Sequence, residues 1–257
     1  MAGTHVPSFA DLNGQHIEYV RYSGKAPELV FLHEGLGSVA MWRDFPQRVA
    51  DSTGHAALVY SRVGYGHSSR LTIARRPDYM HVEALKTLPT LLDRLAIERP
   101  VLIGHSDGAS IALIHAGAGA REVQAVAALA PHVFVEEVSL ASIANSKRAF
   151  EKGDLRERLA RHHGDVDSAF RGWNDIWLAP AFRNWNIESS LSRIECPILL
   201  IQGKDDEYGT LAQLDAIERQ VPGRVERVEL AACGHSPQRD QPEATLSALM
   251  HFIAAVA

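Results

Sequence analysis

Short strand-like runs bounded by Gly or Pro recur along the first half of the chain, separated by longer segments of helical character, and the later runs are nearly continuously apolar. Runs of this kind are typical of strands that helices cover on both faces of a sheet. Regular alternation of strand and helix predicts an α/β fold with right-handed crossovers. The predicted strands are residues 17–22, 29–32, 56–60, 101–103 and 123–129, and the predicted helices are residues 41–50, 81–96 and 109–116.

This alternation breaks between residues 133 and 195, where the sequence becomes charged and helical and carries several large aromatic side chains. Pro197 then opens a new apolar run, a position at which proline is tolerated in a strand. We predict one α/β core, residues 1–132 and 196–257, with residues 133–195 inserted as a helical lid, called here the helical insertion. The late core elements are strand 198–201, helix 211–220, strand 225–230 and helix 242–256.

Composition narrows the range of partners. The 257 residues include 26 Lys and Arg against 31 Asp and Glu, and the basic residues are scattered, so a nucleic-acid partner is not expected. Cys196 and Cys233 lack the spacing of a zinc site or a disulfide framework. With no secretory signal near the N-terminus and no membrane-spanning apolar run, we expect a cytoplasmic protein without membrane contact. The expected partner is a small-molecule substrate, and monomer and homodimer stay equally open.

Residues 104–108 read Gly-His-Ser-Asp-Gly and lie between a predicted strand and a predicted helix. This G-x-S-x-G pattern in a strand–turn–helix context is typical of a nucleophile elbow. The sharp turn would hold Ser106 in a strained conformation and bring strand and helix so close that only small residues fit at Gly104 and Gly108. The alternative is an ordinary Gly-Ser turn before a helix. The pattern predicts Ser106 as a catalytic nucleophile.

A serine nucleophile needs a base, and the base needs an orienting carboxylate. If the triad follows the chain order serine, acid, histidine, the acid and the histidine lie in loops after the late strands. Asp206 lies in one such loop and is our predicted acid, with Asp205 and Glu207 as alternatives. His235 follows the last predicted strand and is the predicted base among 13 histidines.

Five motifs, taken together and in their order along the chain, resemble the α/β-hydrolase family over nearly the whole chain. They are Phe31-Leu32-His33-Glu34-Gly35-Leu36-Gly37-Ser38, Gly64-Tyr65-Gly66-His67-Ser68, Gly104 to Gly108, Gly203 to Asp206, and Gly234-His235. The resemblance implies a mostly parallel central sheet with a lid inserted after the sixth strand. It also implies an oxyanion hole built from backbone N–H groups of the residue after the nucleophile, Asp107, and of the turn after His33.

The turn after His33 departs from the family pattern, because Glu34 stands where glycine is usual. Aligned without gaps, Gly35 becomes the first donor, and a shifted loop would use Glu34 or Leu36 instead. Glu34 itself either caps this loop or presents its carboxylate to the substrate.

Asp107 bears on the substrate class. The G-x-S-D-G variant resembles that of the valacyclovir-hydrolase-like and biphenyl-hydrolase-like group, in which this acid implies recognition of an amino group on the ester. A bare carboxylate favours a cationic substrate. The alternative, which the sequence supports equally, is that Asp107 caps the first turn of the helix, a common role for Asp.

Aromatic residues Phe170, Trp173 and Trp177 are spaced to share one helix face in the insertion. This face either packs the insertion onto the core or closes over an apolar ester, and Trp173 and Trp177 are candidate substrate-binding residues. His105, His132, His162 and His163 form no coherent ligand set, so we expect structural or pocket-lining roles for them and neither a metal nor a cofactor.

The predicted function is hydrolysis of a small to medium carboxylic ester through an acyl-enzyme. Related chemistry keeps one alternative open, namely carbon–carbon bond hydrolysis of aromatic meta-cleavage products. A non-catalytic ligand receptor is a third hypothesis, because a fold does not prove a function. A fourth is an NADP-dependent oxidoreductase, since residues 35–40 fit G-x-G-x-x-A and Arg62 could meet a 2′-phosphate, but no acid closes the following run and the three triad candidates stay unexplained.

Overall fold

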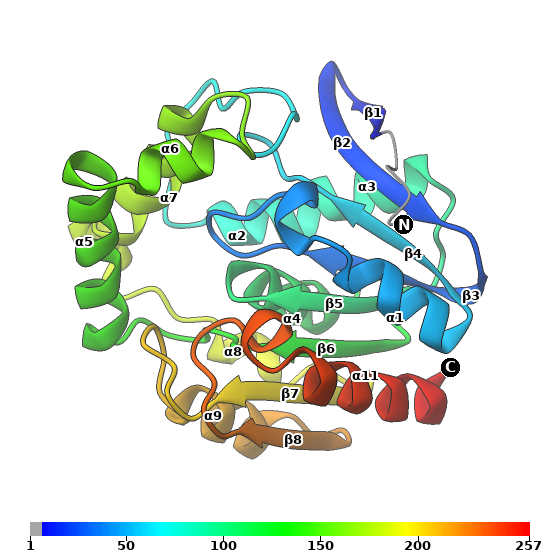
Figure 1. Cartoon of the computed structure of the whole chain (residues 1–257). Coiled ribbons are helices and arrows are strands. Elements are labelled where there is room, and N and C mark those ends of the chain that lie inside the picture. Colours follow the sequence, from blue (N-terminus) through cyan, green and yellow to red (C-terminus); the bar gives the residue numbers. More distant parts are fainter. Residues whose placement is uncertain (1–6) are drawn as a thin grey trace.

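The computed structural model describes residues 7–257 and is built around one eight-stranded sheet. Strands β3 to β8 run parallel, while β2 pairs antiparallel with β4 and β1 antiparallel with β2. The strand order β1-β2-β4-β3-β5-β6-β7-β8 is drawn in Figure 1. The bounds are β1 Ser8–Leu12, β2 Gln15–Tyr22, β3 Lys25–Leu32, β4 His55–Tyr60, β5 Val101–His105, β6 Ala125–Leu129, β7 Ile198–Gly203 and β8 Val225–Leu230.

Helices cover both faces of this sheet, which confirms the predicted α/β fold class. One face packs against α1 (Phe45–Thr53) and α11 (Pro242–Val256) through side chains such as Phe31 and Ile103. The other face carries α2 (Tyr79–Val82), α3 (Leu88–Arg94), α4 (Asp107–Ala118), α8 (Glu188–Leu191) and α9 (Ala212–Gln220).

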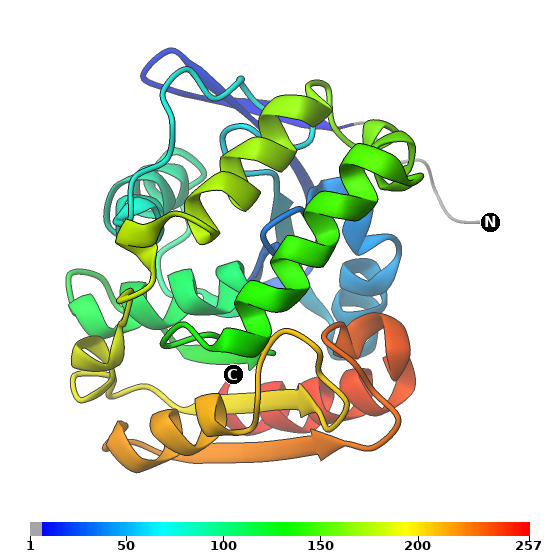
Figure 2. The ribbon, with the colours of Figure 1, turned by 90° about the vertical axis from the view of Figure 1, so that its left-hand side faces the viewer.

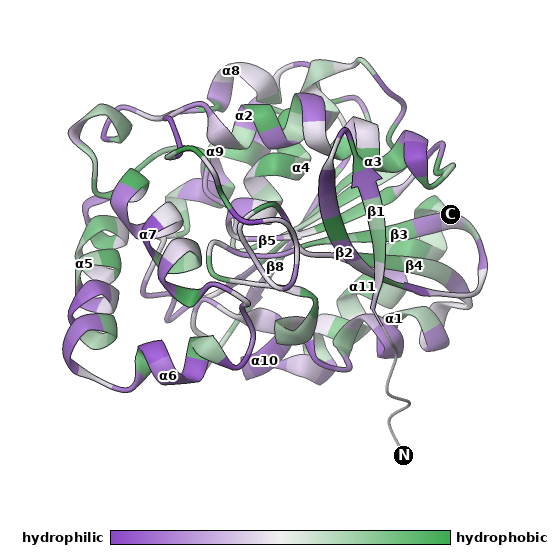
Figure 3. Ribbon diagram, turned by 90° about the horizontal axis from the view of Figure 1, so that it is seen from above, coloured by the Kyte–Doolittle hydropathy of each residue, from purple (hydrophilic) through white to green (hydrophobic). Residues whose placement is uncertain are grey.

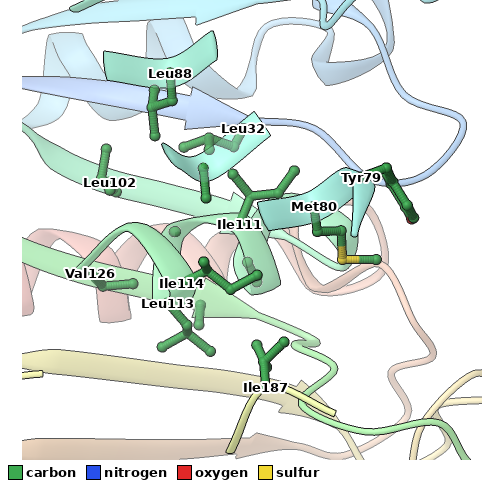
Figure 4. Close-up of a cluster of buried hydrophobic side chains, with 14 of the residues drawn as sticks. Leu32, Tyr79, Met80, Leu88, Leu102, Ile111, Leu113, Ile114, Val126 and Ile187 are labelled. Carbon is green, nitrogen blue, oxygen red and sulfur yellow. The ribbon is translucent and has the colours of Figure 1, made fainter. Parts of the chain in front are cut away.

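The packing on this second face of the sheet shows why the central strands are apolar without alternation. Leu102 and Val126 of the sheet lie against Ile111 and Ile114 of α4, and all four side chains are buried (Figure 4). Alternate residues of the same strands serve the opposite face, so both faces must be apolar. Viewed from above, hydrophobic strands lie inside and hydrophilic positions gather on the outer helices and loops (Figure 3).

The helical insertion contains α5 (Glu137–Lys152), α6 (Leu155–Ala160), α7 (Val166–Trp177), a short 3-10 turn (Pro180–Phe182) and α8. In Figures 1 and 2, α5 and α7 lie across the end of the core toward which the β7 arrow points. Active-site groups of open α/β sheets gather at that end. The division into core and lid stays a prediction.

Three local predictions need correction. The N-terminal strand β1 was not predicted. In place of the single helix expected at residues 41–50, the structure has a 3-10 turn, Val39–Trp42, followed by the separate helix α1. Pro46 lies in the first turn of α1, where its missing N–H costs no hydrogen bond. The helix expected at residues 81–96 begins earlier, at α2, and contains a π-helical turn, Glu83–Thr87, just before Pro89, which cannot donate to the preceding turn.

None of the helices in residues 7–257 combines the length and apolarity needed to cross a membrane.

Candidate active site

Ser106 lies in the turn between β5 and α4, as its motif predicts. Its backbone has φ 53° and ψ −118°, a strained combination for a residue with a side chain. A Cβ at Gly104 would overlap the Gly108 carbonyl oxygen, and a Cβ at Gly108 would overlap the Leu32 carbonyl. The two glycines are therefore required by close backbone approach, as the sequence analysis expected. The turn projects Ser106 Oγ beyond the sheet, at the start of a helix.

His235 and Asp206 come from loops that follow β8 and β7, and they meet Ser106 in one hydrogen-bonded chain. Ser106 Oγ lies 2.9 Å from His235 Nε2, and Asp206 Oδ1 lies 2.9 Å from His235 Nδ1. This is the geometry in which an imidazole takes a proton from a serine while a carboxylate fixes its tautomer.

The surroundings of Asp206 distinguish it from its acidic neighbours. Its carboxylate accepts hydrogen bonds from the backbone N–H groups of Tyr208 and Gly209 and from the side chain of Gln202. Burial raises the pKa of Asp206, but the hydrogen bond and charge of His235 outweigh it, so the pKa lies below its ordinary value. Asp205 is exposed, and Glu207 accepts a hydrogen bond from the His235 backbone N–H instead.

Two turns near Ser106 carry the candidate oxyanion donors Gly35 and Asp107. Among residues 7–257, no group accepts a hydrogen bond from the backbone N–H of either residue, so both N–H groups are free to bind an anion. Trp173 of α7 packs so closely over Gly35 that a Cβ there would overlap its indole ring. Glycine at position 35 is therefore needed for the insertion to approach this turn.

The Glu34 carboxylate is held by a neighbouring histidine in the pocket wall, and both of its predicted roles stay predictions. Its carboxylate lies 3.4 Å from His105 Nδ1, and it also lines the pocket in front of Ser106. Burial raises the pKa of Glu34, but the hydrogen bond and the charge of His105 outweigh this effect and lower the pKa to about 2. The pocket therefore carries an ionised carboxylate that is already held by a protein partner.

The Asp107 side chain corrects two expectations. It neither caps α4 nor presents a bare carboxylate to the pocket, because it is fully buried outside the pocket lining. Tyr79 Oη donates to Asp107 Oδ2 at 2.6 Å, and Trp177 Nε1 donates to Asp107 Oδ1 at 3.3 Å. Arg62 Nη1 lies 3.6 Å from Asp107 Oδ2. With its charge met by a buried guanidinium, Asp107 supplies no site for a cationic substrate.

Arg62 is the residue that sequence reasoning misread, since it was considered only as a partner for a cofactor phosphate. The Arg62 side chain is fully buried and donates to the Glu34 carbonyl at 2.8 Å and to the His33 carbonyl at 3.3 Å. Its backbone N–H donates to His33 Nε2 at 3.0 Å. The signal available in the sequence was a single arginine just after an apolar run, two residues beyond the end of β4.

A cavity of about 360 Å³ lies in front of Ser106 and reaches the insertion. Trp173 and Trp177 of α7 form part of its wall, whereas Phe170 turns away and stacks on Phe150 at 3.8 Å between ring centroids. The aromatic face of α7 thus packs onto the molecule and also lines the pocket. The lining residues are Glu34, Gly35, Leu36, His105, Ser106, His132, Ile143, Arg158, Trp173, Trp177, Glu207, Tyr208, His235, Ser236 and Arg239.

The remaining histidines divide between the pocket and the framework. His105 and His132 line the pocket, whereas His162 does not and is only half-buried. His163 accepts a hydrogen bond from the Gly66 N–H and donates to the Leu36 carbonyl, tying the insertion to two core turns. Within residues 7–257, no group of three His, Cys, Asp or Glu side chains is placed to hold a metal ion.

Known proteins resemble this chain both in sequence and in fold. The family model described as "Alpha/beta hydrolase family" matches residues 29–248. An esterase of Mycobacterium tuberculosis is 26% identical, over 94% of this chain and 87% of its own length.

Solved structures share the fold at low sequence identity. An alpha/beta hydrolase fold protein from Chitinophaga pinensis superimposes with a TM-score of 0.77, 16% identity and coverage of 97% of this chain and 98% of that one. The enol-lactonase from Burkholderia xenovorans superimposes with a TM-score of 0.74, 21% identity and coverage of 96% and 100%.

Proposed function

Because the chain belongs to the alpha/beta hydrolase family, we propose that this hydrolase cleaves a small to medium carboxylic ester through an acyl-enzyme, with Ser106 as nucleophile. The observation that carries the proposal is the chain of two 2.9 Å hydrogen bonds from Ser106 through His235 to Asp206. A serine alcohol becomes a useful nucleophile only with such a base and orienting acid.

In the proposed reaction, His235 Nε2 takes the proton of Ser106 as Oγ attacks the ester carbonyl carbon. Asp206 holds the imidazolium through Nδ1 and remains ionised throughout. The carbonyl oxygen becomes negative and is bound by the N–H groups of Gly35 and Asp107, each worth about 3 kcal/mol in such a site.

Collapse of this intermediate expels the alcohol, which receives the proton from His235. A water molecule, deprotonated by His235, then attacks the acyl-enzyme, and the same steps release the acid and restore Ser106.

The pocket supports the proposed size of substrate. A volume of about 360 Å³ is at the small end of the range for ligand sites. Trp173 and Trp177 would contact the apolar part of the ester, and the Glu34 carboxylate would disfavour an anionic group beside it. The buried pairing of Asp107 with Arg62 argues against selection for an amino group by Asp107.

The experiment is hydrolysis of p-nitrophenyl esters from acetate to octanoate, with an amino-acyl ester included, by the wild type, Ser106→Ala and the control Ser52→Ala. Ser52 is exposed on α1 and does not line the pocket. We expect turnover of a short or medium ester that Ser106→Ala abolishes and Ser52→Ala retains. Turnover that survives in Ser106→Ala would refute the assigned nucleophile.

A vinylogous diketone of the meta-cleavage type belongs in the same panel. If this compound were turned over with Ser106 dependence and the esters were not, the reaction would be carbon–carbon bond hydrolysis instead.

A further inference from the structure

His132 lies on the loop after β6, and its backbone is held in place from two sides. Ser110 Oγ donates to the His132 carbonyl at 2.6 Å, and the next residue, Val133, donates its N–H to Gln213 Oε1 at 2.7 Å. Gly209 lies against the ring, where a Cβ would come within 3.3 Å of His132 Cε1. The loop therefore directs the imidazole to one fixed position in the pocket wall.

The ring of His132 is enclosed by the proposed catalytic base and the insertion. Its centroid lies 5.4 Å from that of His235 and 5.3 Å from that of Trp177, with the Trp177 rings at 68° to it. A group bound to His132 would therefore lie close to the reacting atoms. The Trp177 N–H cannot serve such a group, since it already donates to Tyr79 and Asp107.

The hydrogen-bonding state of His132 differs from that of the other histidines in the pocket. His235 uses both ring nitrogens, and His105 donates from Nε2 to the His235 carbonyl while Nδ1 contacts Gln238. His132 is only 2% exposed, and neither of its ring nitrogens has a hydrogen-bond partner among residues 7–257. Nδ1 is fully buried beside Gly209, so Nε2 is the nitrogen that a ligand in the pocket can reach. Buried polar groups are normally paired, so an unpaired imidazole in a pocket wall indicates a place for a ligand atom.

The imidazole is uncharged at neutral pH. Burial lowers the pKa of His132 to about 3, and the neighbouring His235 lowers it in the same direction. A neutral imidazole offers one N–H donor and one nitrogen acceptor. It can therefore donate to a keto oxygen or accept from a hydroxyl group, but it provides no positive charge for a carboxylate.

We propose that His132 forms a polar subsite that selects substrates bearing a second, uncharged oxygen, a hydroxyl or keto group close to the scissile ester. The inference rests on the proposed function and narrows its substrate class to hydroxy- and keto-substituted esters. Such an oxygen satisfies a nitrogen that an unsubstituted ester leaves unpaired, which is how a buried polar group discriminates between substrates.

The charges around the pocket favour an uncharged group at this subsite. Glu34 lines the same cavity as an ionised carboxylate and repels an anion. Arg158 and Arg239 also line it, but both are exposed to solvent. An anionic substituent would pair with these exposed arginines and not with the neutral imidazole of His132.

The test compares two matched substrate pairs: p-nitrophenyl butyrate with p-nitrophenyl 3-hydroxybutyrate, and propyl butyrate with 3-hydroxypropyl butyrate. The first pair places the extra oxygen on the acyl side and the second on the alcohol side. The variants are His132→Phe, His132→Asn and the control His251→Phe, an exposed histidine of α11. A mono-ester of succinate serves as the anionic comparison.

We expect the wild type and His251→Phe to prefer the hydroxylated member of one pair by about tenfold in kcat/KM, the value of one good hydrogen bond. His132→Phe should bring the ratio of kcat/KM values within that pair close to one, and His132→Asn should retain part of the preference. Absence of a preference in the wild type, a preference that survives in His132→Phe, or a stronger preference for the succinate ester would each overturn the inference.

A binding measurement separates failure of the inference from failure of the proposed function. Ser106→Ala is titrated with the same pairs, following tryptophan fluorescence, because Trp177 lies against His132. The subsite is supported if Ser106→Ala binds a hydroxylated ester about tenfold more tightly than its unsubstituted partner and the double variant Ser106→Ala with His132→Phe does not. This result supports the subsite even if the wild type turns over none of the esters. Equal affinities within both pairs overturn it.

Discussion

The Arg62 guanidinium and the Asp107 carboxylate face each other across 3.6 Å, and both side chains are fully buried. The same guanidinium donates to the Glu34 carbonyl at 2.8 Å. Since Gly35 follows Glu34, one side chain contacts both turns that carry the proposed oxyanion donors. One buried arginine thus bridges two turns whose proposed donors, Gly35 and Asp107, are 72 residues apart along the chain.

Replacing Arg62 by Met is expected to damage both activity and stability. The two turns lose their common partner, so kcat should fall about tenfold to a hundredfold, less than the loss of about a hundredfold or more on removing an oxyanion donor outright. Removing one partner of a buried pair costs about 3–5 kcal/mol, because the other charge is left uncompensated.

The Arg62→Met measurements are ester kinetics and urea unfolding. Arg48→Met is the control, because Arg48 pairs with Glu243 at an exposed position. The double variant Arg62→Met with Asp107→Asn should recover part of the stability, as no buried charge stays unpaired. A folded Arg62→Met protein with unchanged kcat would show that the arginine is only structural.

Trp177→Phe tests the link between the insertion and the nucleophile turn. The variant keeps an aromatic ring but loses the N–H that donates to Tyr79 and Asp107. We expect a loss of about 1–3 kcal/mol in the free energy of unfolding, since buried acceptors lose their donor, together with a higher KM.

Trp185→Phe is the matched control for Trp177→Phe. Trp185 is a buried neighbour whose indole N–H has no acceptor among residues 7–257, so its replacement removes no hydrogen bond. Equal losses of stability in the two variants would contradict the role assigned to the Trp177 N–H.

Asp206→Asn should leave the fold intact and lower kcat by about 10⁴, because an amide neither fixes the required tautomer of His235 nor stabilises its charged form. Asp205→Asn, at an exposed neighbouring position, should change kcat little. Comparable losses in both variants, measured on one ester, would contradict the choice of Asp206.

Glu34 should contribute stability that depends on pH. Its pKa in the folded protein is about 2, below the ordinary value of 4.5, so the folded state favours the ionised form. The contribution is therefore complete above pH 4.5 and disappears as the pH falls toward 2, with an upper size of about 3 kcal/mol.

The measurement for Glu34 is urea unfolding of the wild type and Glu34→Gln at several pH values between 7 and 3. The wild type should be the more stable protein at pH 7, and the difference should narrow below pH 4.5. A difference that stays constant over this range would contradict the ionic pairing of Glu34 with His105.

The sequence predicted those features that depend on local pattern. Strand 225–230 and helix 242–256 coincide with β8 and α11, because their apolar periods and Pro242 mark them clearly. The fold class and the close approach at Gly104 and Gly108 were also predicted, since G-x-S-x-G in a strand–turn–helix context is a steric requirement.

Features that depend on long-range partners could not be predicted in the same way. Asp107 alone suggested a cap or a substrate carboxylate, and only the fold brings Arg62, Tyr79 and Trp177 to it. The edge strand β1 likewise depends on pairing with β2, which its short sequence does not reveal.

The proposed reaction places the acyl group on Ser106. Its most direct test is mass spectrometry of the protein after rapid quenching during turnover of a p-nitrophenyl ester and, separately, after reaction with a fluorophosphonate. We predict one acyl or phosphonyl group per chain, located on the peptide that contains Ser106 and absent from Ser106→Ala. A modification on another residue, or ester turnover by Ser106→Ala at the wild-type rate, would contradict the assignment of Ser106 as nucleophile.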